Sequence, residues 1–267
     1  MTTPPPDLPS WIDRVGVFDL ETTGVDVALD RIVTAHVGVL DRRGSEIAAR
    51  TWLADPGVPI PEAASAIHGI STEQARRDGA PAHEVVAAIV SSLRALLDQG
   101  VPIVAYNASF DLSMLDHEAR RHGIAPLEAP SPVIDPLVID KAYDRYRPGK
   151  RTLDVVAAHY DIALIGAHDA SADAVAAGRV AQAIARRFDL PPTAGELHTR
   201  QVGWARAQAA SLTEYFISIG RIEPEETIDG TWPVRAAEHA ESGRSPAEST
   251  PAGEPAPAER ATADMLF

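Results

Sequence analysis

The chain has 267 residues, no cysteine and a formal net charge of −14. Its hydrophobic fraction of 45% is enough to bury a core, so we expect a globular protein with one large domain, alone or with an appendage. The absence of cysteine excludes disulfides, thiolate metal sites and cysteine nucleophiles. The acidity argues against a protein that coats nucleic acid through many basic side chains. We find no signal-peptide pattern and no apolar run long enough to span a membrane, and therefore expect a cytoplasmic protein.

The first predicted strand lies within residues 15–24 and ends in two carboxylates, Asp19 and Glu21, before a polar turn that closes at Gly24. Side chains alternate between the two faces of a strand, so Asp19 and Glu21 point to the same side. Neighbouring acids repel each other unless a cation or a shared proton lies between them. This strand end is therefore a candidate metal site; the alternative is a pair of solvated acids.

Two further strands are predicted over residues 31–40 and 47–53, joined by a short turn that contains Gly44. A proline-rich loop follows, and residues 66–70 are too short and too broken by glycine to form a regular element. Apolar side chains then recur at helical spacing over about residues 81–97, ahead of Gly100. They predict a helix that covers one face of the sheet.

Strands alternate with helices in the next part of the chain. A short apolar strand over residues 101–106 leads into a helix for which Asn107 is a plausible cap, with Asp111 in its first turn. Residues 132–135 give a fifth strand, and further helices are predicted over residues 137–146, 153–160 and 171–188. Three hairpin strands followed by strand–helix alternation predict an α/β domain. Its mixed five-stranded sheet would have three antiparallel and two parallel strands, with helices on its faces.

The prolines at positions 191 and 192 mark a predicted boundary between a main domain, residues 1–190, and a small helical appendage, residues 191–236. The appendage contains a predicted helix over residues 196–219. From residue 237 the chain is rich in Ala, Glu, Pro and Ser, with two basic and six acidic side chains, which predicts a disordered linker. The segment finishes in three apolar residues, Met265, Leu266 and Phe267.

One segment departs from the general acidity. Residues 141–151 contain five Lys or Arg side chains and two tyrosines, against a single acid, Asp144. A basic, aromatic loop of this kind suits a phosphate backbone. The alternative is a solvated helix end.

Four acids and one histidine fall where predicted strands end and the following helices begin. Beside the first pair of acids, Asp111 and Asp173 each lie in the first turn of a helix, and His168 precedes Asp173 by five residues. Functional groups gather at such an edge of an α/β sheet. Carboxylate oxygens suit Mg²⁺ or Mn²⁺, two such ions can hold the attacking and leaving oxygens of a phosphodiester, and a histidine can take the proton of the attacking water. The pattern predicts hydrolysis of a phosphodiester bond.

Five motifs also follow one another in the order found in DnaQ-like exonucleases of the DEDDh type. They are FDLETTG at residues 18–24, IHGI at 67–70, NASFD at 107–111, PGKRTLD at 148–154 and HDASADA at 168–174. Over about residues 15–188 the chain resembles this family, in particular its branch of proofreading ε subunits of bacterial DNA polymerase III and their stand-alone relatives. The resemblance implies an RNase H-like fold, two Mg²⁺ or Mn²⁺ ions and stepwise 3′→5′ removal of nucleotides.

The resemblance also implies roles for single residues. By position the metal ligands would be Asp19, Glu21, Asp111 and Asp173, with His168 as the general base and Glu21 counted as catalytic as well. The implied substrate contacts are Thr22 and Thr23 at the terminal nucleotide, His68, Gly69 and Ile70 against the last base, Asn107 and Phe110 on its other side, and Lys150 and Arg151 on phosphates. Alternatives stay open: His68 as a loop histidine without contacts, Phe110 as a core residue, and the two basic residues as supports of their loop.

We therefore expect a metal-dependent 3′→5′ exonuclease acting on single-stranded DNA or a frayed 3′ end, in proofreading or repair. One alternative is a 3′→5′ exoribonuclease acting on short RNA; another is a polymerase or clamp accessory with an idle site, against which the retention of all five acidic and histidine positions argues. A DNA polymerase is a further expected partner. Met265, Leu266 and Phe267 resemble the anchor of sliding-clamp ligands, although without their leading glutamine; the alternative is an apolar end without a partner.

Overall fold

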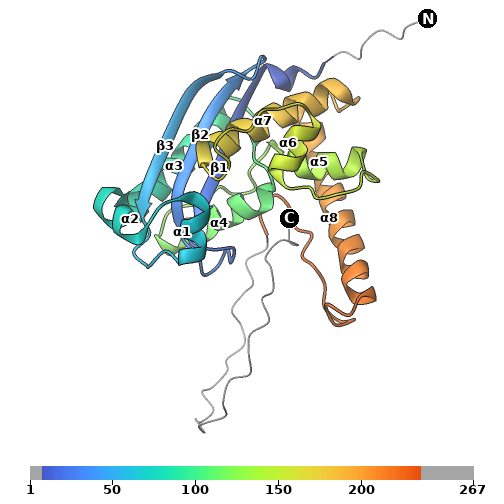
Figure 1. Ribbon diagram of the computed structural model, residues 1–267. Helices are drawn as coiled ribbons and strands as arrows, with labels where there is room; N and C mark the ends of the chain where they lie inside the picture. The colour runs from blue at the N-terminus through green and yellow to red at the C-terminus, as the bar shows by residue number, and fades with distance from the viewer. Residues whose placement is uncertain (1–7, 236–267) are drawn as a thin grey trace, which may run out of the picture.

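A mixed six-stranded sheet forms the centre of the structure, a computed structural model that describes residues 8–235 (Figure 1). Its antiparallel part consists of β1 (Arg14–Thr22), β2 (Ile32–Asp41) and β3 (Glu46–Asp55). β5 (Ile103–Val104) and β6 (Val133–Ile134) continue the sheet in parallel beyond β1, and β4 (Ala80–Pro81) pairs with the end of β3. The order β4-β3-β2-β1-β5-β6 confirms the expected mixed α/β sheet. The additional strand, β4, has two residues and is too short to show a sequence pattern.

Helices cover both faces of this sheet (Figure 1). One face carries α3 (Ala82–Asp98) and α4 (Ala108–Arg121). The other carries α5 (Pro136–Tyr143), α6 (Leu153–His159) and α7 (Ala170–Arg187). A 3₁₀ turn, η1 (Ser10–Asp13), precedes β1, and α8 (Ala194–Ser218) follows α7.

The alternation of side chains along β1 assigns its residues to the two faces. Val15 and Val17 lie in the core formed with α7, whereas Phe18 and Leu20 lie in the core formed with α3 and α4. Residues two apart in a strand share a face. The continuation of the Val15 and Val17 side of β1, at positions 19 and 21, therefore faces α7.

Helix α7 lies unusually close to the sheet because a glycine faces it. A Cβ atom on Gly178 would lie 2.4 Å from Val17 Cγ1 and 2.6 Å from Leu40 Cδ1. Real apolar carbons rest at about 3.5–4.0 Å from one another. The glycine thus sets the distance between α7 and the strand that carries the first two acids.

A short helix ends within residues 66–70, the segment for which no regular element was expected, so that prediction was wrong. α1 (Glu62–His68) ends at Gly69, which adopts a left-handed conformation with φ of 79°. α2 (Thr72–Asp78) starts directly afterwards, with Ser71 Oγ accepting a hydrogen bond from the Gln74 amide. The glycine is therefore the cap of one helix, a role that glycine performs readily because it has no Cβ.

Helix α8 closes the open edge of the sheet at β6. His198 Nδ1 accepts a hydrogen bond from the Val133 amide at 3.1 Å, and Gln201 Nε2 donates to the Val133 carbonyl at 3.0 Å. Side chains thus satisfy the backbone groups that a further strand would have paired.

The expected division at residue 190 stays a prediction. Within residues 8–235, no helix combines the length and apolar character that a membrane crossing requires.

Candidate active site

Three carboxylates converge between the end of β1 and the start of α7. Asp19 and Glu21 share the face of β1 that α7 covers, and Asp173 lies in the first turn of α7. Each offers an oxygen atom, and these atoms all lie within 4.8 Å of one another. Within the described part of the chain this is the one group of three or more side chains that could together hold a metal ion.

The fourth predicted acid, Asp111, lies beside this group, in the first turn of α4. β5 pairs with β1 only at Gly16 and Val17, so β1 extends beyond it without a strand on that side. There Asp111 Oδ1 accepts a hydrogen bond from the Leu20 amide at 3.1 Å. The carboxylate of Asp111 is thereby tied to the backbone between the two acids of β1, and it is almost fully buried.

The charges of the cluster act on one another. Burial, followed by the charges of Asp111 and Glu21, raises the pKa of Asp19 well above its ordinary value. Burial and the charge of Asp173 raise the pKa of Glu21 to about 8. Burial likewise raises the pKa of Asp173 and that of Asp111. A carboxyl group with a raised pKa holds its proton to a higher pH than a free carboxyl group does, unless a cation takes the place of the proton.

The cluster fits a divalent cation on its own chemistry. Oδ2 of Asp173 accepts a hydrogen bond from the His168 amide at 3.1 Å, whereas its Oδ1 atom is buried without a hydrogen-bond partner. A buried oxygen without a partner costs free energy that an ion would recover. Hard cations such as Mg²⁺ and Mn²⁺ prefer such oxygens.

His168 lies at the mouth of this site, on the exposed loop that leads into α7. Its backbone is in the left-handed region with φ of 68°, a conformation that is uncommon for a residue with a side chain. The hydrogen bond from its amide to Asp173 holds that conformation. The structure thus places the backbone of His168 next to the carboxylate cluster, where its amide is hydrogen-bonded to Asp173.

The turn after β1 is held by its own side chains. Thr22 Oγ1 donates to the Gly24 carbonyl at 2.6 Å, and Thr23 Oγ1 donates to Asp30 Oδ1 at 2.8 Å. The Thr23 hydroxyl also accepts from the Arg31 amide. Thr23 is buried and Thr22 is half-buried, so of these two predicted substrate contacts the side chain of Thr22 is the more accessible to a substrate.

His68 closes α1 near this turn. Its Nδ1 accepts a hydrogen bond from the Ile70 amide at 3.2 Å, while its Nε2 is buried without a partner. Burial lowers the pKa of His68 and the Thr22 carbonyl opposes that shift, which places the ring beside the turn. Gly69 is exposed, and Ile70 packs on Val33 and its neighbours.

The two predicted contacts at the start of α4 have partly structural roles. Asn107 occupies the cap position with φ of 60°, but its side chain makes no capping hydrogen bond. Asp135 performs that role, because its carboxylate accepts from the amides of Asn107 and Ala108 at 3.0 and 2.9 Å. Phe110 is half-buried and packs against the core under α3 and α4.

The basic loop divides into a buried and an exposed part. Arg151 is buried, pairs with the carboxylate of Asp140 and donates to the carbonyls of Asp144 and Arg147. Of the two roles left open for Arg151, these contacts favour support of the loop over contact with a phosphate. Lys150 is exposed.

Three acids near the site were not singled out from the sequence. Asp169 caps α7 by accepting from the amides of Ser171 and Ala172, and its charge contributes to the raised pKa of Glu21. Asp154, in the first turn of α6, has its pKa lowered chiefly by the Thr152 side chain, with a contribution from His168. Asp135 precedes Pro136, and an acid before a proline is the signal of a helix start that could have identified its capping role.

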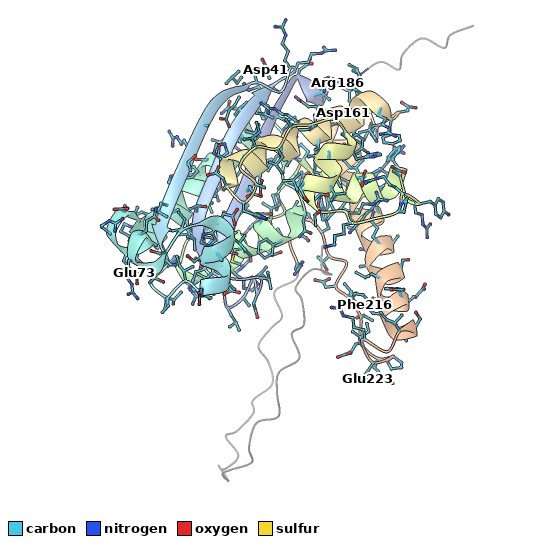
Figure 2. All side chains as sticks on the ribbon, in the orientation of Figure 1. Asp41, Glu73, Asp161, Arg186, Phe216 and Glu223 are labelled. Atoms are coloured by element: carbon cyan, nitrogen blue, oxygen red, sulfur yellow. The ribbon has the colours of Figure 1, made fainter. Side chains whose placement is uncertain are left out.

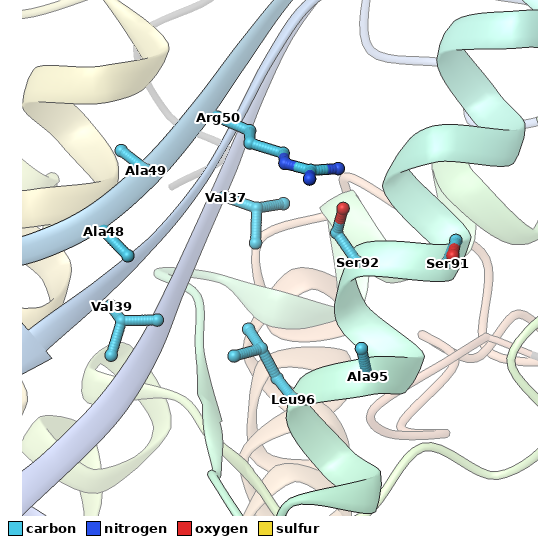
Figure 3. Close-up of a pocket in the computed structure, with 9 residues that line it drawn as sticks. All are labelled: Val37, Val39, Ala48, Ala49, Arg50, Ser91, Ser92, Ala95 and Leu96. Carbon is cyan, nitrogen blue, oxygen red and sulfur yellow. The ribbon is translucent and has the colours of Figure 1, made fainter.

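One cavity lies away from the predicted site, and three of the predicted residues lie outside the described part of the chain. A cavity of about 410 Å³ between α3 and strands β2 and β3 is lined by small and apolar side chains with Arg50, Ser91 and Ser92, and by none of the predicted site residues (Figure 3). Met265, Leu266 and Phe267 lie outside the described residues.

Comparisons with known proteins agree with this geometry. The family model described as exonuclease, RNase_T, matches residues 17–181. DNA polymerase III of the PolC type from Lacticaseibacillus paracasei is 29% identical over 168 residues, which are 63% of this chain and 11% of that protein. The same protein from Halalkalibacterium halodurans is 30% identical over 164 residues, 61% of this chain and 11% of that one. The chain thus spans about a tenth of the length of the curated relatives it matches.

Solved structures show the same fold. E. coli exonuclease I in complex with a dT13 oligonucleotide superposes with a TM-score of 0.54 and 23% identity, over 64% of this chain and 40% of that one. Another structure of exonuclease I gives a TM-score of 0.56 and 20% identity, over 77% and 46%. These matches confirm the RNase H-like fold. Together with the family model, which covers more than half of the chain, they confirm the resemblance drawn from the motifs: this chain belongs to the exonuclease family RNase_T.

Proposed function

We propose that this chain is a metal-dependent 3′→5′ exonuclease that hydrolyses the terminal phosphodiester bond of DNA and releases nucleoside monophosphates. The observation that carries the proposal is the convergence of Asp19, Glu21 and Asp173, whose oxygen atoms lie within 4.8 Å of one another. A fourth acid, Asp111, is tied to the same strand. Two Mg²⁺ or Mn²⁺ ions bound there would neutralise the acids and supply Lewis-acid activation of the phosphate and of a water.

The surrounding groups can perform the remaining tasks. The four acids would hold the ions, and His168 would accept the proton of the attacking water, since an imidazole nitrogen can act as a general base. The turn that starts at Thr22 and Thr23 would seat the 3′-terminal nucleotide. His68, Gly69, Ile70, Asn107 and Phe110 would border its base, and Lys150 would meet the phosphates.

The comparisons support DNA over RNA as substrate. E. coli exonuclease I binds an oligodeoxythymidine in the solved complex, and the curated relatives are DNA polymerase III proteins. We infer a role in proofreading or repair on a single strand or frayed 3′ end in the cytoplasm, with a DNA polymerase as partner. A sliding clamp is a second proposed partner, with Met265, Leu266 and Phe267 as the residues that would contact it.

A labelled oligonucleotide tests this function. With Mg²⁺ or Mn²⁺, a 5′-labelled DNA strand should shorten in single-nucleotide steps, and a 3′-labelled strand should lose its label as a mononucleotide in the first step. Asp19→Asn should reduce the rate by at least about 100-fold, because even groups that only support metal ligands cost 10–100-fold when removed. Asp98→Asn, an exposed acid at the end of α3, is the matched control and should retain the rate.

The same assay separates the alternatives. Faster removal of nucleotides from RNA than from DNA of the same sequence would replace DNA by short RNA as the substrate. No release from either strand, or equal release by Asp19→Asn, would mean an idle accessory protein. Internal cleavage would contradict the exonuclease assignment.

A further inference from the structure

A groove of about 550 Å³ lies between α5, the loop that follows it and α8. Its lining includes a basic wall with Lys141, Arg145 and Arg147, and an apolar wall with Trp204, Leu212 and Tyr215 on α8. None of the predicted metal ligands lines it. The groove is thus a feature separate from the acidic site, and a ligand could bind in it whether or not the chain is a nuclease.

Two of the cationic side chains in the basic wall are not paired with an acid of the described chain. Arg147 is occupied by the carboxylates of Asp140 and Asp144. Lys141 and Arg145 make no ion pair with a described residue. Arg145 is exposed and lies over the ring of Tyr146, at 5.8 Å from the ring centre. In a chain with a net charge of −14, two such cations beside one groove mark a local site for carboxylates.

The opposite wall exposes apolar surface along one side of α8. Leu212 and Tyr215 are 40% and 57% exposed, and they lie three residues apart, so they are neighbours on the helix. Figure 2 shows the far half of α8 projecting from the body of the domain, with Phe216 labelled on it and Glu223 beyond its end. Apolar side chains grouped beside polar ones on a surface are typical of an interaction site.

The basic wall and the apolar wall together fit a peptide better than a nucleic acid strand. A nucleic acid strand draws its affinity from many cations in contact with phosphates. Here two guanidinium groups, those of Arg147 and Arg151, are committed to acids of the protein, and the α8 wall is apolar. A short peptide that carries carboxylates next to apolar side chains satisfies both walls.

The chain itself contains such a peptide. Residues 264–267 are Asp, Met, Leu and Phe, and the 32 residues from 236 to 267 contain two basic and six acidic side chains. The last described residues lie against α8 and α4: Trp232 packs on His198 of α8, with ring centres 5.0 Å apart, and the Arg235 amide donates to Ser113 Oγ of α4. The root-mean-square span of a random coil of about 28 residues is about 30 Å, comparable with the length of α8, about 38 Å for 25 residues.

We propose that residues 264–267 dock in this groove in cis. Met265, Leu266 and Phe267 cover Leu212 and Tyr215, and Asp264 with the acids before it faces Lys141 and Arg145. Because the segment is tethered to the domain, its effective concentration at the groove is near millimolar, as for other short tethers. In the intact chain the groove is therefore already occupied by residues 264–267.

A fluorescein-labelled peptide of residues 258–267 tests the proposal by anisotropy in EDTA. The receptor is the full chain with Leu266→Asp and Phe267→Asp, whose own segment no longer competes. We expect this receptor to bind the peptide at least 10-fold more tightly than the unaltered chain does. Adding Lys141→Glu or Tyr215→Ser to the receptor should weaken binding at least 10-fold. The matched controls Arg50→Glu and Ile47→Ser, exposed side chains on β3, should change it less than twofold.

The outcomes are distinct once circular dichroism and thermal melting show that each variant is folded. Equal binding by the unaltered chain and the receptor, or no loss in the two groove variants, overturns docking in cis. A parallel binding assay uses a labelled dT12 strand in place of the peptide. If the groove variants weaken binding of this strand while the peptide does not bind, the groove is a nucleic-acid-binding site and the proposal is wrong.

Discussion

Replacement of Gly178 by alanine should loosen the contact on which the geometry of the acidic site depends. The new methyl group would lie 2.4 Å from Val17 Cγ1 and 2.6 Å from Leu40 Cδ1, both of which are buried. Since apolar carbons rest at about 3.5–4.0 Å, α7 must withdraw by about 1 Å. Overpacking of this kind costs about 1–3 kcal/mol, which lowers Tm by about 3–10 °C in a domain of this size.

The same displacement would move Asp173 on α7 away from Asp19 and Glu21 on β1. A misplacement of about 1 Å can cost about 100-fold in rate, so we expect exonuclease activity to fall by about 10- to 100-fold. Differential scanning calorimetry and the 3′-label assay measure the two effects. Gly203→Ala in α8, where a Cβ meets nothing within 4 Å, is the control and should stabilise the chain by about 0.5–1 kcal/mol. A Gly178→Ala variant as stable and active as the unaltered chain would refute this account of α7.

Three further predictions concern charge and the turn. Burial raises the pKa of Glu21 from 4.5 to about 8, so without a divalent ion the folded chain binds more protons than the unfolded chain between these pH values. The free energy of unfolding in urea should therefore fall as pH rises through this window, and Glu21→Gln should reduce that slope by the contribution of this one group. Asp140→Ala leaves two guanidinium groups without their buried partner and should cost about 3–5 kcal/mol in denaturant unfolding; a loss below 1 kcal/mol would contradict the network. Thr23→Val removes the hydrogen bond to Asp30 and the one from the Arg31 amide, so it should lower Tm and raise KM for oligonucleotides, whereas an unchanged KM would remove the turn from substrate binding.

Local patterns predicted most of the fold because they have local causes. The alternation in β1 and the helical spacing in α3 follow from which side chains are buried, and both elements lie where they were expected. The error at residues 66–70 arose because Gly69 was taken to interrupt structure. Its left-handed conformation instead caps α1, which ends at His68.

Two features of the candidate site depend on contacts between distant residues and could not be predicted from local sequence patterns. The face shared by Asp19 and Glu21 followed from strand geometry, but the side from which Asp173 reaches them depends on the packing of α7 at Gly178. Likewise, burial of Arg151 depends on its pairing with Asp140, eleven residues away. A basic residue in a loop has the same local signature whether it meets a phosphate or an acid of its own chain.

Nucleotide release from a 3′-labelled DNA strand during a titration with Mn²⁺ tests the proposed metal site most directly. We expect no release in EDTA, release that rises with Mn²⁺ for the unaltered chain, and at least about a 100-fold lower rate for Asp173→Asn at every concentration. Metal-independent release, or an Asp173→Asn variant with the full rate, would contradict the assignment of the carboxylates on β1 and α7 as the metal site.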